Sequence, residues 1–294
     1  MDNFVVGIGE VLWDVLPDGR KAGGAPSNFA YHVSQFGLPG RVVSAVGQDS
    51  LGEELLSVLR DKGLESVIST VPYPTGTVQV TLDKDGIPRY DIKEGSAWDN
   101  ILYTPELEDL AKHTGAVCFG SLAQRSTVSA NTIGRFIDHV PANCLKIFDI
   151  NLRQNYYSEK VVSASLQKCN ILKINDEELE VVSRMYSLSG TSMQEKCAGL
   201  MSSFGLRALI LTCGASGSYV FSSGCTSYIK TPEVDVADTV GAGDSFTAAF
   251  TAGMLSGLDL GQAHQLAVET SAFVCTQEGA MPELPERLIR MCRK

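Results

Sequence analysis

The residues with the clearest chemical potential lie near the C-terminal end of the chain, in a glycine-flanked turn that enters an apolar helix. The segment reads Ala237-Asp238-Thr239-Val240-Gly241-Ala242-Gly243-Asp244-Ser245-Phe246 and places Asp244 in the first helical turn. Because Gly241 and Gly243 have no Cβ, backbone N–H groups can point into one concavity, where the helix N-terminus adds its attraction for an anion. A carboxylate would repel a phosphate bound there, unless it takes a proton from a hydroxyl that attacks the phosphate. An Asp N-cap on a helix with a glycine-rich entry would equally explain the pattern.

Further polar residues follow apolar runs, where the strands of a sheet would end. Ligands of open α/β sheets bind at the carboxyl ends of the strands. The residues are Asp14, Gly23, Gly24 and Asn28 near the N-terminus, Asp149, Asn151 and Arg153, then Asn175 and Glu178, and finally Thr212, Gly214 and Gly217. One cleft at the sheet edge would bring these groups together.

Each group also has a purely structural interpretation. Asn175 and Glu178 have the spacing of a capping box, although acidic oxygen at a strand-to-helix turn also suits hydrated Mg²⁺. The glycines after Thr212 either hold nucleotide phosphates or form a hairpin. Asp14 and Asn28 either bind sugar hydroxyls or serve as turn and helix-start residues. The chain has no G-x-x-x-x-G-K-[ST] motif, which excludes a P-loop enzyme.

Composition restricts the classes of partner. The 294 residues carry a net charge of −10, which argues against nucleic-acid or anionic-membrane surfaces, because both need clustered Lys and Arg. The first residues lack the basic segment of a signal peptide, so we expect neither a signal peptide nor a membrane span, and a cytoplasmic location. The eight cysteines and four histidines show no ligand spacing, and we expect buried thiols and packed or surface imidazoles.

Apolar runs alternate with helical patterns along the chain and predict a mostly parallel sheet covered by helices on both faces. The expected strands are 4–8, 116–119, 147–150, 171–174, 208–211 and 218–221. The expected helices are 26–36, 52–62, 177–185, 192–204, 244–255 and 260–276, with a short one from 283. The fold class is therefore a three-layer α/β/α sandwich in a single domain, 1–294.

Residues 77–82 and 89–92 break this pattern, because polar and apolar residues alternate on either side of a turn. Such alternation predicts a hairpin with one wet face, which belongs to a small antiparallel sheet rather than to the buried parallel one. With the segment of about 12–24, residues of about 72–98 would form a lid over the cleft. Its open strand edges suggest a homodimer formed through the lid.

Taken together, these features resemble the ribokinase-like (PfkB) family of carbohydrate kinases over essentially the whole chain. The most specific match is the segment from Asp238 to Asp244, supported by Gly23, Gly24 and Asn28. The resemblance implies that Asp244 is the catalytic base and that Gly241, Ala242 and Gly243 form the anion hole.

The same resemblance implies the remaining roles. It assigns the sugar to Asp14, Gly24 and Asn28, with Arg153 as a further substrate residue, and ATP to Asn175, Thr212, Gly214 and Gly217. Glu178 would reach Mg²⁺ through water, and Asp238 corresponds to a K⁺ ligand.

Within the family, residues 120–125, 149–153 and 76–80 resemble fructokinases, which makes D-fructose the expected acceptor and fructose 6-phosphate the product. Arg89, Arg125 and Arg153 keep a charged acceptor open, because a phosphosugar or 2-keto-3-deoxygluconate needs guanidinium partners. A nucleoside kinase and a non-catalytic nucleotide- or sugar-sensing protein of the same fold also stay open.

Overall fold

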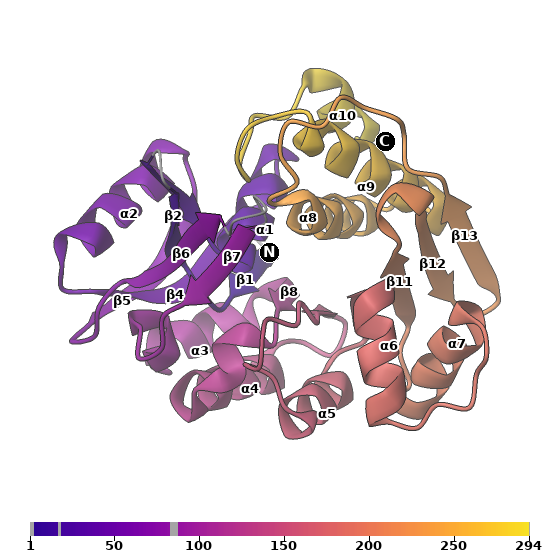
Figure 1. The fold of residues 1–294 in the computed structure, drawn as a ribbon, viewed down its shortest axis with the longest axis horizontal. Helices are drawn as coiled ribbons and strands as arrows, with labels where there is room; N and C mark the ends of the chain where they lie inside the picture. The colour runs from indigo at the N-terminus through magenta and orange to yellow at the C-terminus, as the bar shows by residue number, and fades with distance from the viewer. Residues whose placement is uncertain (1–2, 17–18, 83–87, 294) are drawn as a thin grey trace.

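The computed structural model describes residues 3–16, 19–82 and 88–293, with side chains left out of the description for residues 80–82 and 88–90. The described chain forms a central sheet with helices on both of its faces and a smaller sheet to one side (Figure 1). Within this described part, no helix is both long and apolar enough to cross a membrane.

The central sheet orders its strands β13-β12-β11-β10-β9-β8-β1-β4-β5. Their bounds are β1 (Phe4–Ile8), β4 (Gly40–Gly47), β5 (Glu65–Val71), β8 (Thr114–Phe119), β9 (Leu145–Asp149), β10 (Ile171–Asn175), β11 (Ala208–Thr212), β12 (Ser218–Ser222) and β13 (Cys225–Ile229). Every pair from β11 to β5 is parallel, and β12 and β13 add an antiparallel edge. The mostly parallel sheet predicted from the apolar runs is confirmed.

Two groups of helices cover the two faces, as the three-layer prediction requires (Figure 1). One face carries α3 (Pro105–Lys112), α4 (Thr127–His139), α5 (Glu159–Lys168), α6 (Asp176–Met185) and α7 (Met193–Phe204). The other carries α1 (Ala25–Gln35), α2 (Ser50–Asp61), α8 (Ala242–Leu255), α9 (Leu260–Cys275) and α10 (Glu286–Met291). Alternate strand residues enter opposite clusters: Val6 and Phe119 pack with α4, whereas Val5 and Cys118 pack with α1 and α8.

Several elements have no counterpart in the sequence prediction. Strands β4, β5 and β13 and helices α3, α4 and α5 occupy stretches that the prediction left unassigned. Three of the seven residues of β5, Glu65, Ser66 and Thr70, are polar and exposed because β5 is an edge strand, which hides the apolar signature of a buried strand. The eight cysteines are free thiols: Cys225 is exposed, Cys275 is half-buried and the others are buried.

The smaller sheet is the predicted lid, and its strands follow the order β3-β2-β6-β7. Their bounds are β2 (Leu12–Leu16), β3 (Gly19–Gly23), β6 (Gly76–Leu82) and β7 (Pro88–Ile92). The hairpin β6–β7 is antiparallel as predicted, and the N-terminal segment adds two antiparallel strands, β2 and β3, where one was expected. However, β2 and β6 pair in parallel, which corrects the fully antiparallel lid. The lid consists of two hairpins that pair edge to edge. A turn fixes the antiparallel direction of the two strands that it joins, but it does not fix the direction of a strand from the other hairpin. Residues 83–87 of the predicted turn lie outside the described residues, and the dimer stays a prediction.

The close approach of α1 to β1 depends on a glycine and is testable. A Cβ on Gly7 would lie 2.1 Å from the carbonyl oxygen of Pro26, so Gly7→Ala must push the helix away. We expect it to lower the free energy of unfolding by about 1–3 kcal/mol in urea titrations. The matched control is Gly134→Ala in α4, where the nearest atom is 3.9 Å away and a gain of roughly 0.5–1 kcal/mol is expected. Equal effects of the two substitutions would contradict the packing argument.

Candidate active site

Asp244 lies in the first turn of α8, and its Oδ2 accepts a hydrogen bond of 2.7 Å from Asn28 Nδ2 on α1, 216 residues earlier in the chain. Burial raises the pKa of Asp244 to about 6, and the charge of Asp149 raises it further, against the opposing effects of Asn28, Lys173 and Arg153. A carboxylate with a pKa in this range still ionises at neutral pH and is a stronger base than an exposed one.

The helix that presents Asn28 starts at a conformation that favours glycine. Gly24, the N-cap of α1, has φ 113°, and a Cβ there would lie 2.4 Å from the carbonyl oxygen of Glu10. Asn28 is 3% exposed, and its Oδ1 is a buried atom without a partner among the described residues. Its amide is therefore held by the bond to Asp244, and its oxygen is left as an unused acceptor.

The N-terminus of α8 provides donors beside Asp244. Gly241 is the N-cap, with φ 78°, and a Cβ on it would lie 2.7 Å from the Ala280 side chain. The N–H groups of Gly243 and Asp244 belong to the first helical turn, where the backbone has no intrahelical acceptor. The N–H of Ala242 already donates to the Thr239 carbonyl oxygen at 3.3 Å, so it is the least available of the predicted anion-hole donors.

A cation that the sequence prediction missed lies at the same helix end. Lys173 Nζ is 3.0 Å from Asp149 Oδ1 and would lie 2.9 Å from a Cβ built on Gly243. Asp149 Oδ2 in turn accepts a hydrogen bond of 3.0 Å from Thr247 Oγ1. Burial by itself lowers the pKa of Lys173, but the carboxylates of Asp149, Glu178 and Asp244 outweigh it, and the pKa is raised. The signal was available as one lysine within the apolar strand β10.

Glu178 and Asn175 form the predicted capping box. Asn175 Oδ1 accepts from the Glu178 N–H at 2.7 Å, and Glu178 Oε2 accepts from the Asn175 N–H at 2.9 Å. Glu178 Oε1 also accepts from the Leu152 N–H at 2.9 Å, and burial raises the pKa of this side chain. Both carboxylate oxygens are engaged with backbone, so any contact of Glu178 with a metal requires their remaining lone pairs.

The residues predicted for the nucleotide also meet. Asn175 and Thr212 are directly paired at the ends of β10 and β11. Gly214 and Gly217 flank the turn η3 (Gly214–Ser216), with φ 52° and 115°, and a Cβ on Gly217 would lie 2.5 Å from the Ile229 carbonyl oxygen. This turn joins antiparallel β11 and β12, so the two strands form a hairpin, and binding of the nucleotide by its glycines stays a prediction.

On the lid side, Asp14 lies on β2, and burial raises its pKa to about 6. Arg153 lowers that pKa, whereas Asp238 and Asp244 raise it, which means that these charged groups are near neighbours. Arg153 is exposed in the loop after β9. The side chain of Asp238 is bound to the backbone at two places. Its Oδ1 accepts a hydrogen bond from the N–H of Val240 at 3.0 Å, and its Oδ2 accepts one from the N–H of Gly279 at 3.1 Å.

Glu10 is a second residue that the sequence prediction missed. It follows β1, is 4% exposed, and its Oε2 has no partner within the described ranges. Burial raises the pKa of Glu10 to about 7; backbone N–H groups and Arg153 lower it, and the charge of Asp244 raises it. An acidic residue directly after Gly9, at the end of an apolar strand, was the available signal.

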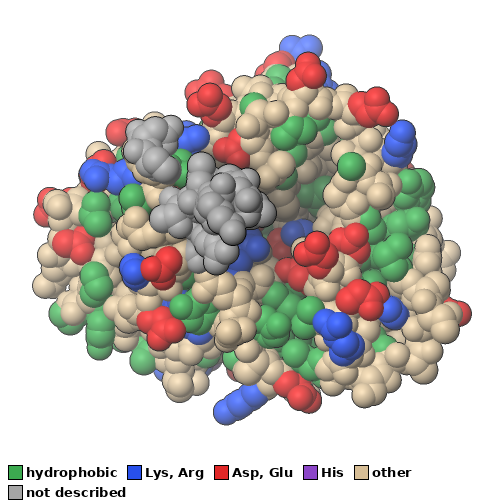
Figure 2. Space-filling model, viewed as in Figure 1, with side chains coloured by type: hydrophobic (Ala, Val, Ile, Leu, Met, Phe, Trp, Pro, Cys, Tyr) green, Lys and Arg blue, Asp and Glu red, His purple; other side chains and the backbone are tan. Residues whose placement is uncertain are grey.

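A small pocket lies beside the carboxylates of Asp244 and Asp149. Residues from α1, β8, α8 and the end of β9 line it, namely Ala25, Pro26, Phe29, Cys118, Phe119, Gly120, Asp149, Asn151, Asp244 and Thr247. Figure 2 shows this side of the molecule hollowed beside the lid, with acidic and basic side chains on the floor of the hollow. In the part of the chain that the structure describes, no three His, Cys, Asp or Glu side chains form a metal cage.

One candidate residue is elsewhere. Arg125, expected to be available to a charged acceptor, forms a buried ion pair with Asp99, and both side chains are 7% exposed. Its guanidinium is already paired because the lid returns to the body at this point. The side chain of Arg89 lies outside the described residues. As expected, His32 and His264 are packed: His32 Nε2 is 2.8 Å from the Ala280 carbonyl oxygen, and the His264 ring lies between two serine hydroxyls.

The sequence of the chain is similar to the sequences of known kinases. The chain is 26% identical over 300 residues to an ATP-dependent 6-phosphofructokinase of Thermoanaerobacterium thermosaccharolyticum, covering 96% of the chain and 91% of the relative. It is 26% identical over 261 residues to a fructokinase of Rhizobium leguminosarum bv. trifolii, covering 84% and 78%.

Solved structures give the same fold. An uncharacterized sugar kinase from Pyrococcus horikoshii in complex with ATP is 25% identical, with a TM-score of 0.81 over 97% of this chain and 98% of that one. A fructokinase of Xylella fastidiosa with bound ATP superposes with a TM-score of 0.85 over 99% and 98% at 18% identity, which shows the fold alone.

The family profile described as pfkB family carbohydrate kinase matches residues 17–287, nearly the whole described chain. The chain therefore belongs to the pfkB family of carbohydrate kinases, as an ATP-dependent sugar kinase.

Proposed function

We propose that the protein transfers the γ-phosphoryl group of ATP to a hydroxyl of D-fructose, giving fructose 6-phosphate, with Asp244 as the general base. The observation that carries the proposal is the carboxylate of Asp244, held by Asn28 at 2.7 Å at the open N-terminus of α8. Relatives named fructokinases, at 24–26% identity, support the choice of sugar.

The residues of the site have two kinds of role, proton transfer and stabilisation of negative charge. Asp244 accepts the proton of the attacking hydroxyl, and the N–H groups of the α8 N-terminus, with Lys173 beside them, face the transferred phosphoryl group. When bound, ATP supplies that group, and Mg²⁺ neutralises charge on its oxygens. Fixed donors in a partly enclosed site stabilise developing charge without reorganisation, so positioning supplies most of the acceleration.

The predicted ligand residues complete the proposal. Asn175, Thr212, Gly214 and Gly217 would hold the nucleotide along the ends of β10 and β11, and Glu178 would reach Mg²⁺ through water. Asp238 would serve the K⁺ site, where the carbonyl oxygen of Ala280 lies 2.9 Å from the position of a Gly241 Cβ. Carbonyl and carboxylate oxygens suit such a hard cation.

The acceptor would lie between the lid and α1, with Asp14, Gly24, Asn28 and Arg153 around it. Asp14 and the free Oδ1 of Asn28 are acceptors for sugar hydroxyls. Since Arg125 is engaged with Asp99, Arg153 is the one predicted guanidinium of known placement that a charged acceptor would find available.

The first test replaces the base. Asp244→Asn keeps an acceptor for Asn28 but cannot take a proton, so we expect turnover to fall roughly 10²–10⁴-fold while ATP and fructose still bind. ADP release measures turnover, and isothermal titration measures binding. Asp235→Asn, at an exposed position of the preceding loop, is the control and should keep normal turnover. Near-normal turnover of Asp244→Asn would remove Asp244 from the mechanism.

The pH dependence follows from the raised pKa values. A protonated Asp244 cannot accept a proton, so kcat/KM for fructose should be level at high pH and fall as the pH drops through about 6. The pKa of Asp14 is also about 6, so Asp14 could cause the same fall. If Asp244 is the cause, the Asp14→Asn variant should still lose kcat/KM as the pH drops through about 6. Profiles of both proteins from about pH 5 to pH 8 check the assignment. A wild-type profile that stays level across this range is the contrary result.

The acceptor is tested by comparing fructose with fructose 6-phosphate. With Arg125 paired to Asp99, Arg153 is the one predicted guanidinium among the described side chains that the added phosphate would find available, so we expect kcat/KM for fructose to be at least about tenfold higher. ADP release with each compound, and with 2-keto-3-deoxygluconate and a nucleoside, measures the preference. Faster reaction with fructose 6-phosphate would make the protein a phosphosugar kinase, and no ADP release with any acceptor would favour a sensing protein.

A further inference from the structure

We infer that Tyr156 is a positioning residue for the acceptor. It connects the loop that carries Arg153 to β7, an outer strand of the lid. The inference deepens the proposed function, because it rests on Arg153 and the lid enclosing the sugar. The structural link consists of the contacts of one phenol hydroxyl, of which the hydrogen bond to Ile92 is the defined one, supported by a rigid network beside it.

The link itself joins the β9–α5 loop (residues 150–158) to the end of β7. Tyr156 Oη donates to the carbonyl oxygen of Ile92 at 3.0 Å, and Ile92 is the last residue of β7. Within the loop, the N–H of Tyr156 donates to the carbonyl oxygen of Arg153 at 3.0 Å. One short turn therefore connects the exposed Arg153 guanidinium to the outer strand of the lid.

The hydroxyl is a dependable donor. Burial raises the pKa of Tyr156, the charge of the nearby Glu94 carboxylate and a hydrogen bond with that side chain raise it further, and Arg125 lowers it. At neutral pH the phenol therefore stays protonated.

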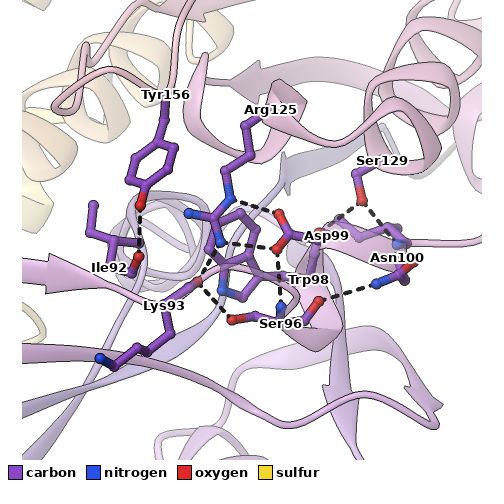
Figure 3. A network of polar contacts seen from close by, with 10 residues as sticks. Ile92, Lys93, Ser96, Trp98, Asp99, Asn100, Arg125, Ser129 and Tyr156 are labelled. Carbon is purple, nitrogen blue, oxygen red and sulfur yellow. Dashed lines mark hydrogen bonds and ion pairs between the residues drawn. The ribbon is translucent and has the colours of Figure 1, made fainter.

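A fixed network holds the base of the lid beside this link (Figure 3). Arg125, in η2 (Leu122–Arg125), donates from Nε and Nη2 to the two oxygens of Asp99 at 2.8 and 2.9 Å, and Nη2 also donates to the Lys93 carbonyl oxygen. Asp99 additionally accepts from the Ser96 N–H at 3.0 Å. The residue directly after β7 is thus bound to the body by a charged group.

Aromatic rings enclose the same guanidinium. The centre of the Arg125 guanidinium lies 4.0 Å from the centroid of the Trp98 ring and 4.6 Å from that of Tyr156 (Figure 3). Trp98 is fully buried, and its Nε1 would lie 2.3 Å from a Cβ on Gly76, the first residue of β6. The network therefore reaches both strands of the hairpin where they leave the body.

The two contacts have different strengths, which gives them different roles. Removing one partner of a buried ion pair is strongly destabilising, so Arg125 and Asp99 form a permanent anchor. The hydrogen bond of a half-buried phenol has a small net stability and can break and reform as the lid moves. The Tyr156 hydrogen bond is the contact that can change. Through it, a shift of β7 alters the position of Arg153, and a shift of Arg153 alters the position of β7.

The test removes the hydroxyl and keeps the ring against Arg125. In Tyr156→Phe we expect the backbone amides of residues 89–93 to exchange with deuterium about fivefold faster, and KM for fructose to rise about fivefold. We expect kcat and KM for ATP to stay within about twofold, because the hydroxyl touches neither Asp244 nor α8. A merely structural role would instead change kcat and both KM values together with thermal stability.

The matched control is Tyr157→Phe, which deletes a hydroxyl from the same loop and leaves the Tyr156–Ile92 hydrogen bond in place. Unchanged exchange in Tyr156→Phe, an equal change in Tyr157→Phe, or faster exchange without a rise in KM for fructose would each overturn the inference. The exchange measurement needs no substrate. If the wild-type protein failed to phosphorylate fructose, the proposed acceptor would be wrong. The deuterium-exchange measurement would still decide whether Tyr156 holds β7.

Discussion

The site depends on the convergence of two helix N-termini, those of α1 and α8, at the carboxyl edge of the parallel sheet. The hydrogen bond between Asn28 and Asp244 joins them across 216 residues of sequence. Convergence requires close backbone approach, which Gly7 allows beneath Pro26 and Gly24 allows beside Glu10. Because both helices present the positive ends of their dipoles there, the edge favours negative charge, whether from the Asp244 carboxylate or from a phosphoryl group.

Concentrating carboxylates at this edge has a cost. The pKa values of Asp244 and Glu10 are raised to about 6 and 7, mainly by burial. Between the unfolded values near 4 and these folded values, the folded state binds more protons, so stability from these groups falls as the pH rises through that window. Lys173, between Asp149 and the α8 N-terminus, offsets part of the repulsion at neutral pH. The molecule thus tolerates unfavourable charge at the position where the proposed reaction needs a base.

The lid is attached by a mixture of rigid and weak contacts. Arg125 and Asp99 anchor the point where β7 returns to the body, and Trp98 packs against the start of β6. The bond from Tyr156 to Ile92 adds a weaker connection to the loop of Arg153.

The local sequence was sufficient for elements whose signal is contained within a few residues. The apolar runs of β1, β10 and β11, the capping box of Asn175 and Glu178, and the alternation in the lid hairpin could all be predicted. The segment ending at Asp244 also indicated its chemistry, because glycines and a carboxylate at a helix start have few joint uses. Edge strand β5 was missed, since its exposed residues resemble a loop.

Only the tertiary structure decided which charges meet. Lys173 and Glu10 were single polar residues in or after apolar strands, and nothing local distinguishes a lysine beside an aspartate from one in solvent. Arg125, which the sequence left open as a partner for a charged acceptor, is paired with Asp99, which comes from a segment that folds onto it. Sequence by itself determined the elements and the type of chemistry, since backbone preference and periodicity are local. Pairing of charges, the parallel contact of β2 with β6 and the meeting of Asn28 with Asp244 required the assembled fold, because they depend on distances between segments far apart in the chain.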